Sequence, residues 1–504
     1  MSKTLLIGCV VLLPTGAVAA SSDTTAPAAT THAEHLGVAT FPSLEIAPQD
    51  RRGGRGGQQR VRVTQLFNET CADCHGETGL GGANGTRSLL TRQHFDQEND
   101  QAFFEMIKEG DPDVGMETFG DYFSDEEIWG FVVHLRELQG KALRAEEGSP
   151  EAVDGVYSSE NHKFRVEDVV DSGLSVPWSL DWLPDGRMLV TNRPGGMYLY
   201  EDGNKVAEVE DLPPSVQLGQ GGLMDVRVHP TNGWTYLSVA DPIAGGGRGA
   251  MTKVYRGKLQ ISAGSAKWTN QETIWETGQE YYGRAGQHFG CKIVFDGEGH
   301  VFFGVGERGT NMRVQDLTTP YGKVMRLNLD GSIPDDNPVP GSSMWTTGHR
   351  NHQGLAFDLE GNLWDTEHGP RGGDEVNQIV KGANYGWPVH AFSINYNDSP
   401  DWTPWNNYGE DFKLPVFRWL PSTGASGLTV ASGPAFPGWK GDLLAGGLVG
   451  ENLDRIRIKD GKMVEREELL HGHGRIRDIR VHADGTVYLV LNRPDKIVRL
   501  VPAN

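Results

Sequence analysis

The chain has 504 residues, which at roughly 100–200 residues per domain predicts several domains, or one large repeat fold with a smaller module. Its net charge of −21 disfavours general binding to phosphate backbones, so we expect no nucleic-acid partner, and its 37% of apolar residues exclude a wholly disordered chain. The 67 Gly and 27 Pro favour short strands and tight turns, and no apolar run approaches the ~18 residues of a membrane-spanning helix, so no transmembrane anchor is expected.

The first 20 residues, MSKTLLIGCVVLLPTGAVAA, have the pattern of a secretory signal peptide. Lys3 precedes an apolar run, and small residues at 17–20 provide a cleavage site. We therefore expect a periplasmic or secreted protein. A lipoprotein signal around Cys9 is the alternative, but little apolar sequence precedes Cys9 and the run continues past it. Residues 21–60 are rich in Ser, Thr, Ala and Pro and then in Arg and Gly, which indicates a flexible leader.

Residues 61–140 are predicted to form a small all-α domain. Residues 63–71 and 101–110 have the apolar spacing of short helices. A longer helix is predicted to begin after Ser124, because Glu127 stands three residues later and completes a capping box. Residues 141–160 are polar and contain Gly and Pro, so we expect a linker there.

The sequence CADCH at residues 71–75 is the attachment signature of a c-type haem. In this motif Cys71 and Cys74 bond the haem vinyl groups and His75 binds the iron. A zinc site or a redox Cys-x-x-Cys is the alternative, but the export signal and the helical module favour haem. Once the signal peptide is removed, Cys291 stands alone, so no structural disulfide is expected.

Met116 is expected to be the second axial ligand of the haem iron, because it lies on a Gly-containing loop between predicted helices. Met106 is the alternative, although its place on an apolar helix face predicts a core residue. A thioether ligand raises the potential of the iron, as suits an electron acceptor. The module resembles a class I cytochrome c over nearly all of residues 61–140, apart from Glu117, where a Pro often follows the ligand Met.

From residue 161 onward the sequence changes to short β-type runs broken by turns. A hairpin unit recurs, with alternating strands around an Asp, Asn or Gly turn. Its copies lie at residues 180–193, 226–240, 293–306, 355–368 and 479–492, with a weaker copy at 437–448. This repetition predicts an all-β six-bladed propeller over residues 161–504, with its active site at the axis. The whole chain is thus predicted to be multidomain, with an all-α module followed by the propeller.

Residues 161–504 also resemble the soluble sugar dehydrogenases that use pyrroloquinoline quinone, the aldose sugar dehydrogenase group. The resemblance rests on the motifs GQGGLMDVRVHP, GQHFGCKIVFDGEGHVFFGVGERG, YGKVMRLNLDGSIPDDNP, TGHRNHQGLAFD, TEHGPRGGDEVNQIVKGANYGWP and GRIRDIRV, in this order. It implies oxidation of an aldose at C1 by hydride transfer to the quinone. His288 matches the family's base, and a neutral imidazole suits that role at neutral pH. Gln220 matches a residue that contacts the sugar.

The same resemblance implies a quinone pocket lined with arginines. The quinone has three carboxylates, and guanidinium groups bind carboxylates through two parallel hydrogen bonds. Arg350 and Asn351 match the family pair beside the quinone. Arg475 and Arg477 match its carboxylate-binding arginines, and their i, i+2 spacing places both on one face of a strand.

Calcium is the third cofactor that the resemblance implies, beside the quinone and haem c. Gly369 and Pro370 match the stretch whose backbone carbonyls bind the calcium ion that touches the quinone. Glu375 and Tyr385 match a second, structural calcium site found in some members. Asp374 is a candidate additional ligand there.

Several residues depart from the family pattern. Val449 stands where the soluble glucose enzymes have a Lys that helps to bind the quinone, which puts cofactor affinity in question. Cys291-Lys292 replaces the usual Gly-Arg, and Cys291 is expected to be a buried apolar residue. His352 replaces the usual Pro after Arg-Asn. Trp419 is expected to pack in the core, with stacking on the sugar or quinone as the alternative.

Together these features predict an exported quinohaemoprotein that passes electrons from the quinone to its own haem and then to an external acceptor such as a soluble cytochrome. The link between the modules raises their effective concentration. One alternative is the same chemistry on sorbosone or on another aldehyde or alcohol. Another is a propeller that only binds, as in the hedgehog-interacting relatives of the fold, with an electron-transfer haem domain attached. His288, Arg350, Arg475 and Arg477 together favour catalysis.

Overall fold

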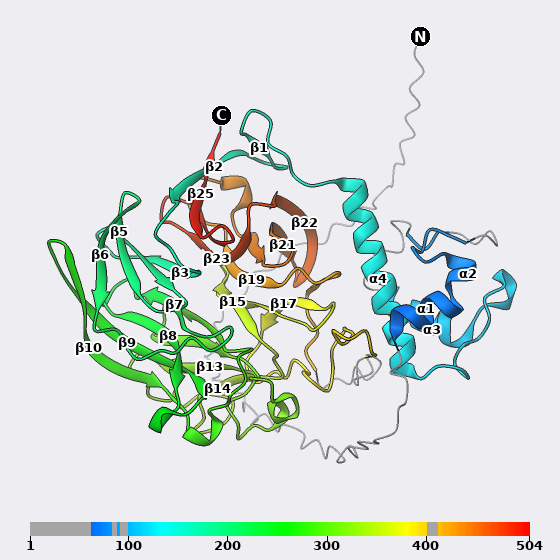
Figure 1. Ribbon diagram of the computed structural model, residues 1–504, viewed down its shortest axis with the longest axis horizontal. Coiled ribbons are helices and arrows are strands. Elements are labelled where there is room, and N and C mark those ends of the chain that lie inside the picture. The colour runs from blue at the N-terminus through cyan, green and yellow to red at the C-terminus, as the bar shows by residue number, and fades with distance from the viewer. Residues whose placement is uncertain (1–61, 83–87, 91–98, 401–411, 504) are drawn as a thin grey trace, which may run out of the picture. The chain divides into compact units, whose positions relative to one another are not determined.

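The computed structural model describes residues 62–82, 88–90, 99–400 and 412–503, and these residues belong to one compact unit (Figure 1). The predicted signal peptide and leader, residues 1–60, lie outside the described residues. None of the helices described is long and apolar enough to cross a membrane.

The first part of the described chain is helical, as its apolar spacing predicts. Its helices are α1 (Val63–Thr70), α2 (Ala72–His75), α3 (Asp100–Glu109) and α4 (Asp125–Glu147), with a 3₁₀ turn η3 (Pro112–Val114). The capping box of α4 is confirmed, because the Ser124 hydroxyl accepts from the Glu127 N–H and the Glu127 carboxylate accepts from the Ser124 N–H. The helix runs on to residue 147, so the first residues of the expected linker are helical, since KALRAEE consists of good helix formers.

Beyond residue 156 the described chain is built mainly from strands. In chain order they are β1 (Tyr157–Ser158), β2 (Lys163–Val170), β3 (Pro177–Trp182), β4 (Met188–Asn192), β5 (Met197–Glu201), β6 (Asn204–Glu210), β7 (Leu223–Val228), β8 (Thr235–Pro242), β9 (Ala250–Ser262), β10 (Ser265–Trp275), β11 (Gly290–Phe295), β12 (His300–Val305), β13 (Lys323–Asn328), β14 (Met344–Thr347), β15 (His352–Phe357), β16 (Leu363–Glu367), β17 (Asp374–Ile379), β18 (Phe417–Trp419), β19 (Ala425–Val430), β20 (Leu443–Gly447), β21 (Asn452–Lys459), β22 (Lys462–His471), β23 (Arg475–Val481), β24 (Val487–Asn492) and β25 (Lys496–Pro502). The 3₁₀ turns between them are η4 (Ala244–Gly246), η5 (Gln279–Tyr281), η6 (Asn311–Gln315) and η7 (Pro437–Trp439).

Most of these strands form sets of four antiparallel neighbours. The sets are β3–β6, β7–β10, β11–β14, β15–β18 and β19–β22, and a parallel pairing of β6 with β10 joins the first two into one sheet. The last sheet has the order β1-β2-β25-β24-β23, so β2 pairs with β25. Four predicted hairpins supply the first two strands of a set, the one at 479–492 supplies β23 and β24 of the last sheet, and the weaker copy at 437–448 covers only β20. The turn glycines have the left-handed conformation that such turns need, with a φ of 89° at Gly186 and 87° at Gly361.

The first strand of each set packs against the first strand of the next. The contacts run β3–β7, β7–β11, β11–β15, β15–β19, β19–β23 and β23–β3, and so return to the starting strand. Buried charges link these strands: Lys292 of β11 pairs with Asp225 of β7 at 3.3 Å and with Asp478 of β23 at 2.8 Å. Arg480 of β23 contacts the same two carboxylates. Loops at the ends of these strands therefore surround a common centre.

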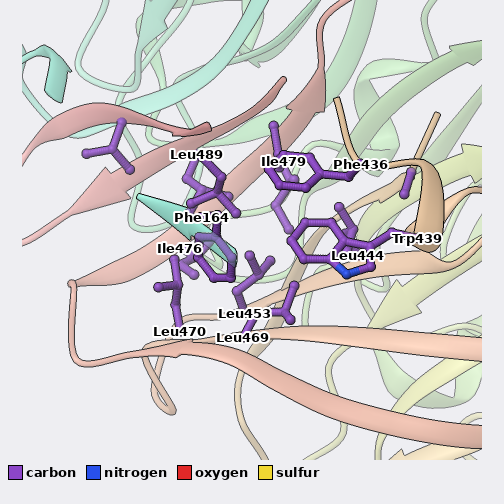
Figure 2. Close-up of a cluster of buried hydrophobic side chains, with 14 of the residues drawn as sticks. Phe164, Phe436, Trp439, Leu444, Leu453, Leu469, Leu470, Ile476, Ile479 and Leu489 are labelled. Carbon is purple, nitrogen blue, oxygen red and sulfur yellow. The ribbon is translucent and has the colours of Figure 1, made fainter. Parts of the chain in front are cut away.

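Phe164 of β2 shows how the start of the β-region joins its end. The ring is fully buried in one hydrophobic cluster with Ile476 and Ile479 of β23 and Leu489 of β24. Figure 2 shows this cluster, to which Trp439 of η7 adds a large side chain from the preceding set. Burial of this apolar area stabilises the pairing of β2 with β25.

Candidate functional site

His288 lies just before β11 and pairs with a buried carboxylate. Its Nδ1 forms a hydrogen bond with Oε1 of Glu307, which follows β12. The other oxygen of Glu307 accepts from the Asn311 N–H at 3.0 Å, and Gln220 Oε1 accepts from the His288 N–H at 2.9 Å. A carboxylate at Nδ1 favours the tautomer whose Nε2 is free to accept a proton.

The protonation of His288 is set by opposing neighbours. Burial lowers its pKa below the ordinary value of 6.5, Arg350 and Arg308 act in the same direction, and Glu307 opposes them. The imidazole is therefore neutral at neutral pH, which is the state that accepts a proton.

Arg308 fixes the loop that carries His288. Its guanidinium donates to the carbonyls of Gln287 and of Ala285, the latter at 2.6 Å, and lies 3.4 Å over the Phe289 ring. Burial lowers the pKa of Arg308 to about 10. His288 itself has a φ of 54°, an uncommon conformation for a residue with a side chain, and such conformations occur often at functional sites.

A cavity of about 410 Å³ adjoins this loop. Phe289 and Gly290 line it directly after His288, together with Gln220. Among the residues predicted for the site, this cavity is also lined by Gly369, Pro370, Arg475 and Arg477. A second, smaller cavity is lined by Arg350, Gly369, Pro370, Glu375 and Tyr385. These predicted residues are therefore divided between two cavities that share the stretch 369–370, whereas His288 and Asn351 line neither cavity and His288 adjoins the larger one only through Phe289 and Gly290.

Arg193, Arg475 and Arg477 bring guanidinium groups to the wall of the larger cavity. Arg477 lies 4.3 Å over the Trp178 ring and donates to Gln353 at 2.8 Å, while its buried Nε has no hydrogen-bond partner among the described residues. Burial, reinforced by Arg475 and Arg193, lowers the pKa of Arg477 to about 9. Cations that disfavour one another's charge in this way are complementary to an anion. The three carboxylates of pyrroloquinoline quinone fit such a wall.

Arg350 and Asn351 connect the two sides of the larger cavity. The Arg350 guanidinium donates to the carbonyls of His368 at 3.0 Å and Gly369 at 2.9 Å. The Asn351 side chain accepts from the Gly290 N–H at 3.2 Å and contacts Nδ1 of His368 at 3.1 Å. The pair thus fixes the stretch at 368–369 against the loop of His288.

The stretch predicted to hold calcium is oriented by Asp374. One oxygen of this carboxylate accepts from the Gly369 N–H at 2.9 Å, and the other accepts from the Ala425 N–H at 2.8 Å. Burial raises the pKa of Asp374 to about 6. The Gly369 carbonyl already accepts from Arg350, so a calcium ion bound by Gly369 and Pro370 fits when the ligand supplies further oxygen atoms.

The smaller cavity, of about 20 Å³, brings the carboxylates of buried Glu367 and half-buried Glu375 together. Glu367 and Glu375 both line it, and burial raises the pKa of Glu367 to about 7 and that of Glu375 above its ordinary range, with Glu367 adding to the latter shift. The Tyr385 hydroxyl donates to the Gln378 carbonyl at 2.5 Å and accepts from the Val380 N–H at 2.9 Å, which leaves its backbone carbonyl as the candidate ligand. Carboxylates that repel one another fit a divalent cation.

The residues of the CADCH motif, which are predicted to attach a haem, lie where α1 meets α2. Cys71 is partly buried and Cys74 is exposed, and the buried Nδ1 of His75 has no hydrogen-bond partner among the described residues. Two thiols and an imidazole within one helical turn fit a covalently bound haem. Met116 is half-buried, on a turn closed by backbone hydrogen bonds to Asp111. The expectation that Met106 is a core residue is wrong, because its side chain is 42% exposed while α3 buries Phe104.

The residues that depart from the family pattern have distinct surroundings. Val449 lines the larger cavity and is 71% exposed. Cys291 is buried beside Trp178, as predicted, and burial raises its pKa to about 12. His352 pairs with Asp365 at 2.5 Å in the interior.

Trp419 is a core residue, which confirms the packing prediction. It lies in a buried cluster of apolar residues, and its indole N–H donates to Asp454 at 2.6 Å. The alternative, stacking on a ligand, is not favoured by this position.

Three residues of this site were missed by the sequence reasoning. Glu307 stands inside the quoted motif GVGERG, so a search for an acid near the base would have found it. Arg193 is the last residue of the first predicted hairpin, at residues 180–193. Trp178 carries no sequence signal for its contact with Arg477.

The chain is similar to proteins of two known families. Residues 174–499 match the family model described as Glucose / Sorbosone dehydrogenase, and residues 59–135 match the one described as Cytochrome C oxidase, cbb3-type, subunit III. An aldose sugar dehydrogenase of Escherichia coli is 34% identical over 353 residues, which cover 67% of this chain and 93% of the relative.

Solved structures show the same likeness. The apo-form of the soluble aldose sugar dehydrogenase from Escherichia coli superimposes with a TM-score of 0.61 and 33% identity, covering 68% of this chain and all of that one. The PQQ-bound form of an aldose sugar dehydrogenase from Streptomyces coelicolor superimposes with a TM-score of 0.54 and has 27% sequence identity. The match covers 68% of this chain and all of that one. With a family match over more than half of its length, the chain belongs to the glucose/sorbosone dehydrogenase family of oxidoreductases and carries a cytochrome c domain on its N-terminal side.

Proposed function

We propose that this protein is an exported quinohaemoprotein dehydrogenase that oxidises an aldose-type sugar at C1. The observation that carries the proposal is the His288–Glu307 pair beside a cavity whose wall holds Arg193, Arg475 and Arg477. This arrangement combines a proton acceptor with a wall that attracts anions. The relatives named aldose sugar dehydrogenases, one of them with PQQ bound, support the same reaction.

In this reaction His288 would act as the base, Glu307 would orient its imidazole, and Gln220 would line the space for the sugar. Glu307 accepts a hydrogen bond from the Nδ1–H of His288, which leaves Nε2 free to take the proton of the C1 hydroxyl while C1 loses a hydride. The sugar thereby loses two electrons and two protons in all, one of the protons leaving with the hydride. Gln220 holds the backbone of His288 and lines the space for the sugar. When bound, the quinone supplies the hydride acceptor and the haem a one-electron route to an external acceptor such as a soluble cytochrome.

The cofactors would be held by the residues that the family motifs name. Arg475 and Arg477, with Arg350 and Asn351, would bind the quinone. Carbonyls of residues 369–370 would bind a calcium ion, which supplies Lewis-acid polarisation. Glu375 and the Tyr385 carbonyl would bind a second calcium ion. Cys71, Cys74, His75 and Met116 would attach and ligate the haem.

We also propose the finer architecture. The sets of four strands would be the blades of a six-bladed propeller over residues 161–504, and the cyclic packing of the first strands supports this. The haem domain would occupy residues 61–140, a connection residues 141–160, and a signal peptide and flexible leader residues 1–60. The protein would then act in the periplasm or outside the cell.

The test is reconstitution of the haem-containing protein with pyrroloquinoline quinone and Ca²⁺, followed by haem absorption as aldoses are added. Reduction of the haem by an aldose is expected. If the haem is reduced only by sorbosone or by another aldehyde or alcohol, that compound and not an aldose is the substrate. If none of these compounds reduces the haem, the β-region is a binding module and the proposed reaction is wrong. The haem spectrum of Met116→Ala tests the ligand separately, because an unchanged low-spin spectrum would assign the position to another residue.

A further inference from the structure

Helix α4 packs against both the other helices of the haem module and the β-region. One hydrophobic cluster contains Phe67 of α1, Trp129 of α4 and also Phe392 and Ile394 of the β-region. The Trp129 and Phe392 rings meet edge to face, with centroids 6.4 Å apart. Gly140 of α4 lies so close to the β-region that a methyl group there would come within 2.0 Å of the Leu420 carbonyl oxygen. The two modules therefore have a common core.

Buried charges also cross this boundary. Asp100 of α3 accepts from Arg136 of α4 and from Arg418 of β18, each at 2.6 Å. All three side chains are at least nine-tenths buried. Separation of the modules would expose the apolar cluster and break the buried contact between Arg418 and Asp100, so the arrangement favours permanent contact over a mobile attachment.

Glu137 of α4 reaches the dehydrogenase cavity itself. It lines the larger cavity and is 3% exposed. Its two oxygens accept from Nε of Arg371 at 3.0 Å and from a terminal nitrogen of Arg371 at 2.7 Å. Arg371 also donates to Asp398 at 2.6 Å, and Asp398 accepts from Thr64 of α1. A single arginine of the β-region is thus paired directly with α4 and linked to α1 through Asp398.

Arg371 directly follows the residues expected to bind calcium beside the quinone. The next residue, Gly372, has a φ of 82°, and a side chain there would meet Val133 of α4 and Leu420 at about 3.2 Å and 3.1 Å. The backbone of residues 369–373 is therefore seated on α4 by an ion pair and by close packing.

We propose that the haem module is a fixed wall of the dehydrogenase cavity and that Glu137 is a positioning residue, which acts through Arg371 to hold the loop at 369–373. The contact itself is independent of the proposed function, whereas the role of this loop in binding the quinone and calcium rests on it. The effective concentration of the haem is then set by a rigid interface and not by the length of a linker.

The experiment uses the full chain with haem attached and compares Glu137→Ala with Glu105→Ala, an exposed glutamate of the same module. Hydrogen–deuterium exchange of residues 369–373 is measured without quinone. In Glu137→Ala we expect exchange at least about tenfold faster, with the haem spectrum unchanged and no change in Glu105→Ala. Equal exchange rates in Glu137→Ala and the unaltered protein would overturn the proposal.

Quinone titration is the second readout. The apparent affinity of Glu137→Ala for pyrroloquinoline quinone with Ca²⁺ is expected to fall about tenfold. Glu137→Gln keeps one acceptor oxygen, so its affinity should lie between those of Glu137→Ala and the unaltered protein. Unchanged affinity in Glu137→Ala would contradict the positioning role. If the unaltered protein binds no quinone, the proposed function fails while the exchange result still decides whether Glu137 holds the loop at 369–373. Should Glu137→Ala not fold, Glu137→Gln and Arg371→Lys give the same measurements.

Discussion

At the scale of single residues, the candidate chemistry of His288 depends on the carboxylate behind it. Glu307 is buried, and His288 is the main influence that lowers its pKa against the effect of burial. Glu307 in turn raises the pKa of His288, which burial lowers. The carboxylate therefore sets both the orientation of the imidazole and the pH at which it becomes neutral.

The variant Glu307→Gln tests this pairing. We expect kcat to fall by roughly 10²- to 10⁴-fold, because an amide that donates to Nδ1 would select the wrong tautomer. The pKa of His288 should fall as well, since the group that raises it is removed, so the acid limb of the kcat/KM profile moves to lower pH. A pH profile of kcat/KM measures both effects, with the exposed Glu280→Gln as control. An acid limb at unchanged or higher pH would contradict the pairing.

The guanidinium groups of Arg193, Arg475 and Arg477 predict that a substitution can lower quinone affinity without lowering the stability of the apo-protein. In Arg477→Met we expect quinone affinity to fall roughly tenfold or more, because a charged hydrogen-bond donor is lost. The apo-protein should be no less stable, since burial and the neighbouring arginines already disfavour the charge of Arg477. Quinone titration and thermal unfolding of the apo-protein measure the two effects, and the exposed Arg248→Met is the control. A lower Tm with normal quinone affinity would refute this account of the wall.

At the scale of elements, the first strands of the sets are joined by charges as well as by apolar packing. Lys292 of β11 pairs with carboxylates on β7 and β23, and all of these side chains are buried. A buried charge that loses its partner is costly. The ion cluster should therefore fix the arrangement of these strands more strongly than an exposed ion pair would.

The variant Lys292→Met removes the cation but keeps an unbranched side chain. We expect the free energy of unfolding to fall by about 3–5 kcal/mol, because Asp225 and Asp478 lose a buried cationic partner. Denaturant unfolding of the apo-protein measures the change. Lys459→Met at the exposed end of β21 should stay within about 0.5 kcal/mol of the unaltered protein. A loss as small as that of the control would show that Arg480 alone satisfies the two carboxylates.

The hairpins could be predicted from the sequence because their signals are local. Alternating strands and a turn glycine within about 14 residues identify β3–β4 or β15–β16. The short strand β18 has no such pattern, and the pairing of β2 with β25 joins ends of the chain that no local signal connects. Likewise His288 could be predicted from a sequence motif. The contact of Glu137 with Arg371 could not, because the two residues are 234 positions apart and no spacing rule relates them.

At the scale of the whole molecule, the net charge of −21 has a consequence for electron acceptors. An acidic surface attracts cationic partners and repels anionic ones, and salt screens both effects. We expect the reoxidation of reduced haem by a basic soluble cytochrome to slow by roughly tenfold as the ionic strength rises from ~0.01 M to ~0.2 M. With ferricyanide, an anion, the rate should rise. Stopped-flow absorption measures both, and a rate with the basic cytochrome that does not respond to salt would contradict the prediction.

The two strands β2 and β25, which pair with each other, are synthesised at opposite ends of translation of the β-region. Strand β2 leaves the ribosome before any of the other large strands, yet its partner is among the last to be made. Until β25 has been made, β2 therefore presents an unpaired edge that other chains can bind. A product that stops short of β25 keeps this edge open, so incomplete chains should be prone to aggregation and to proteolysis.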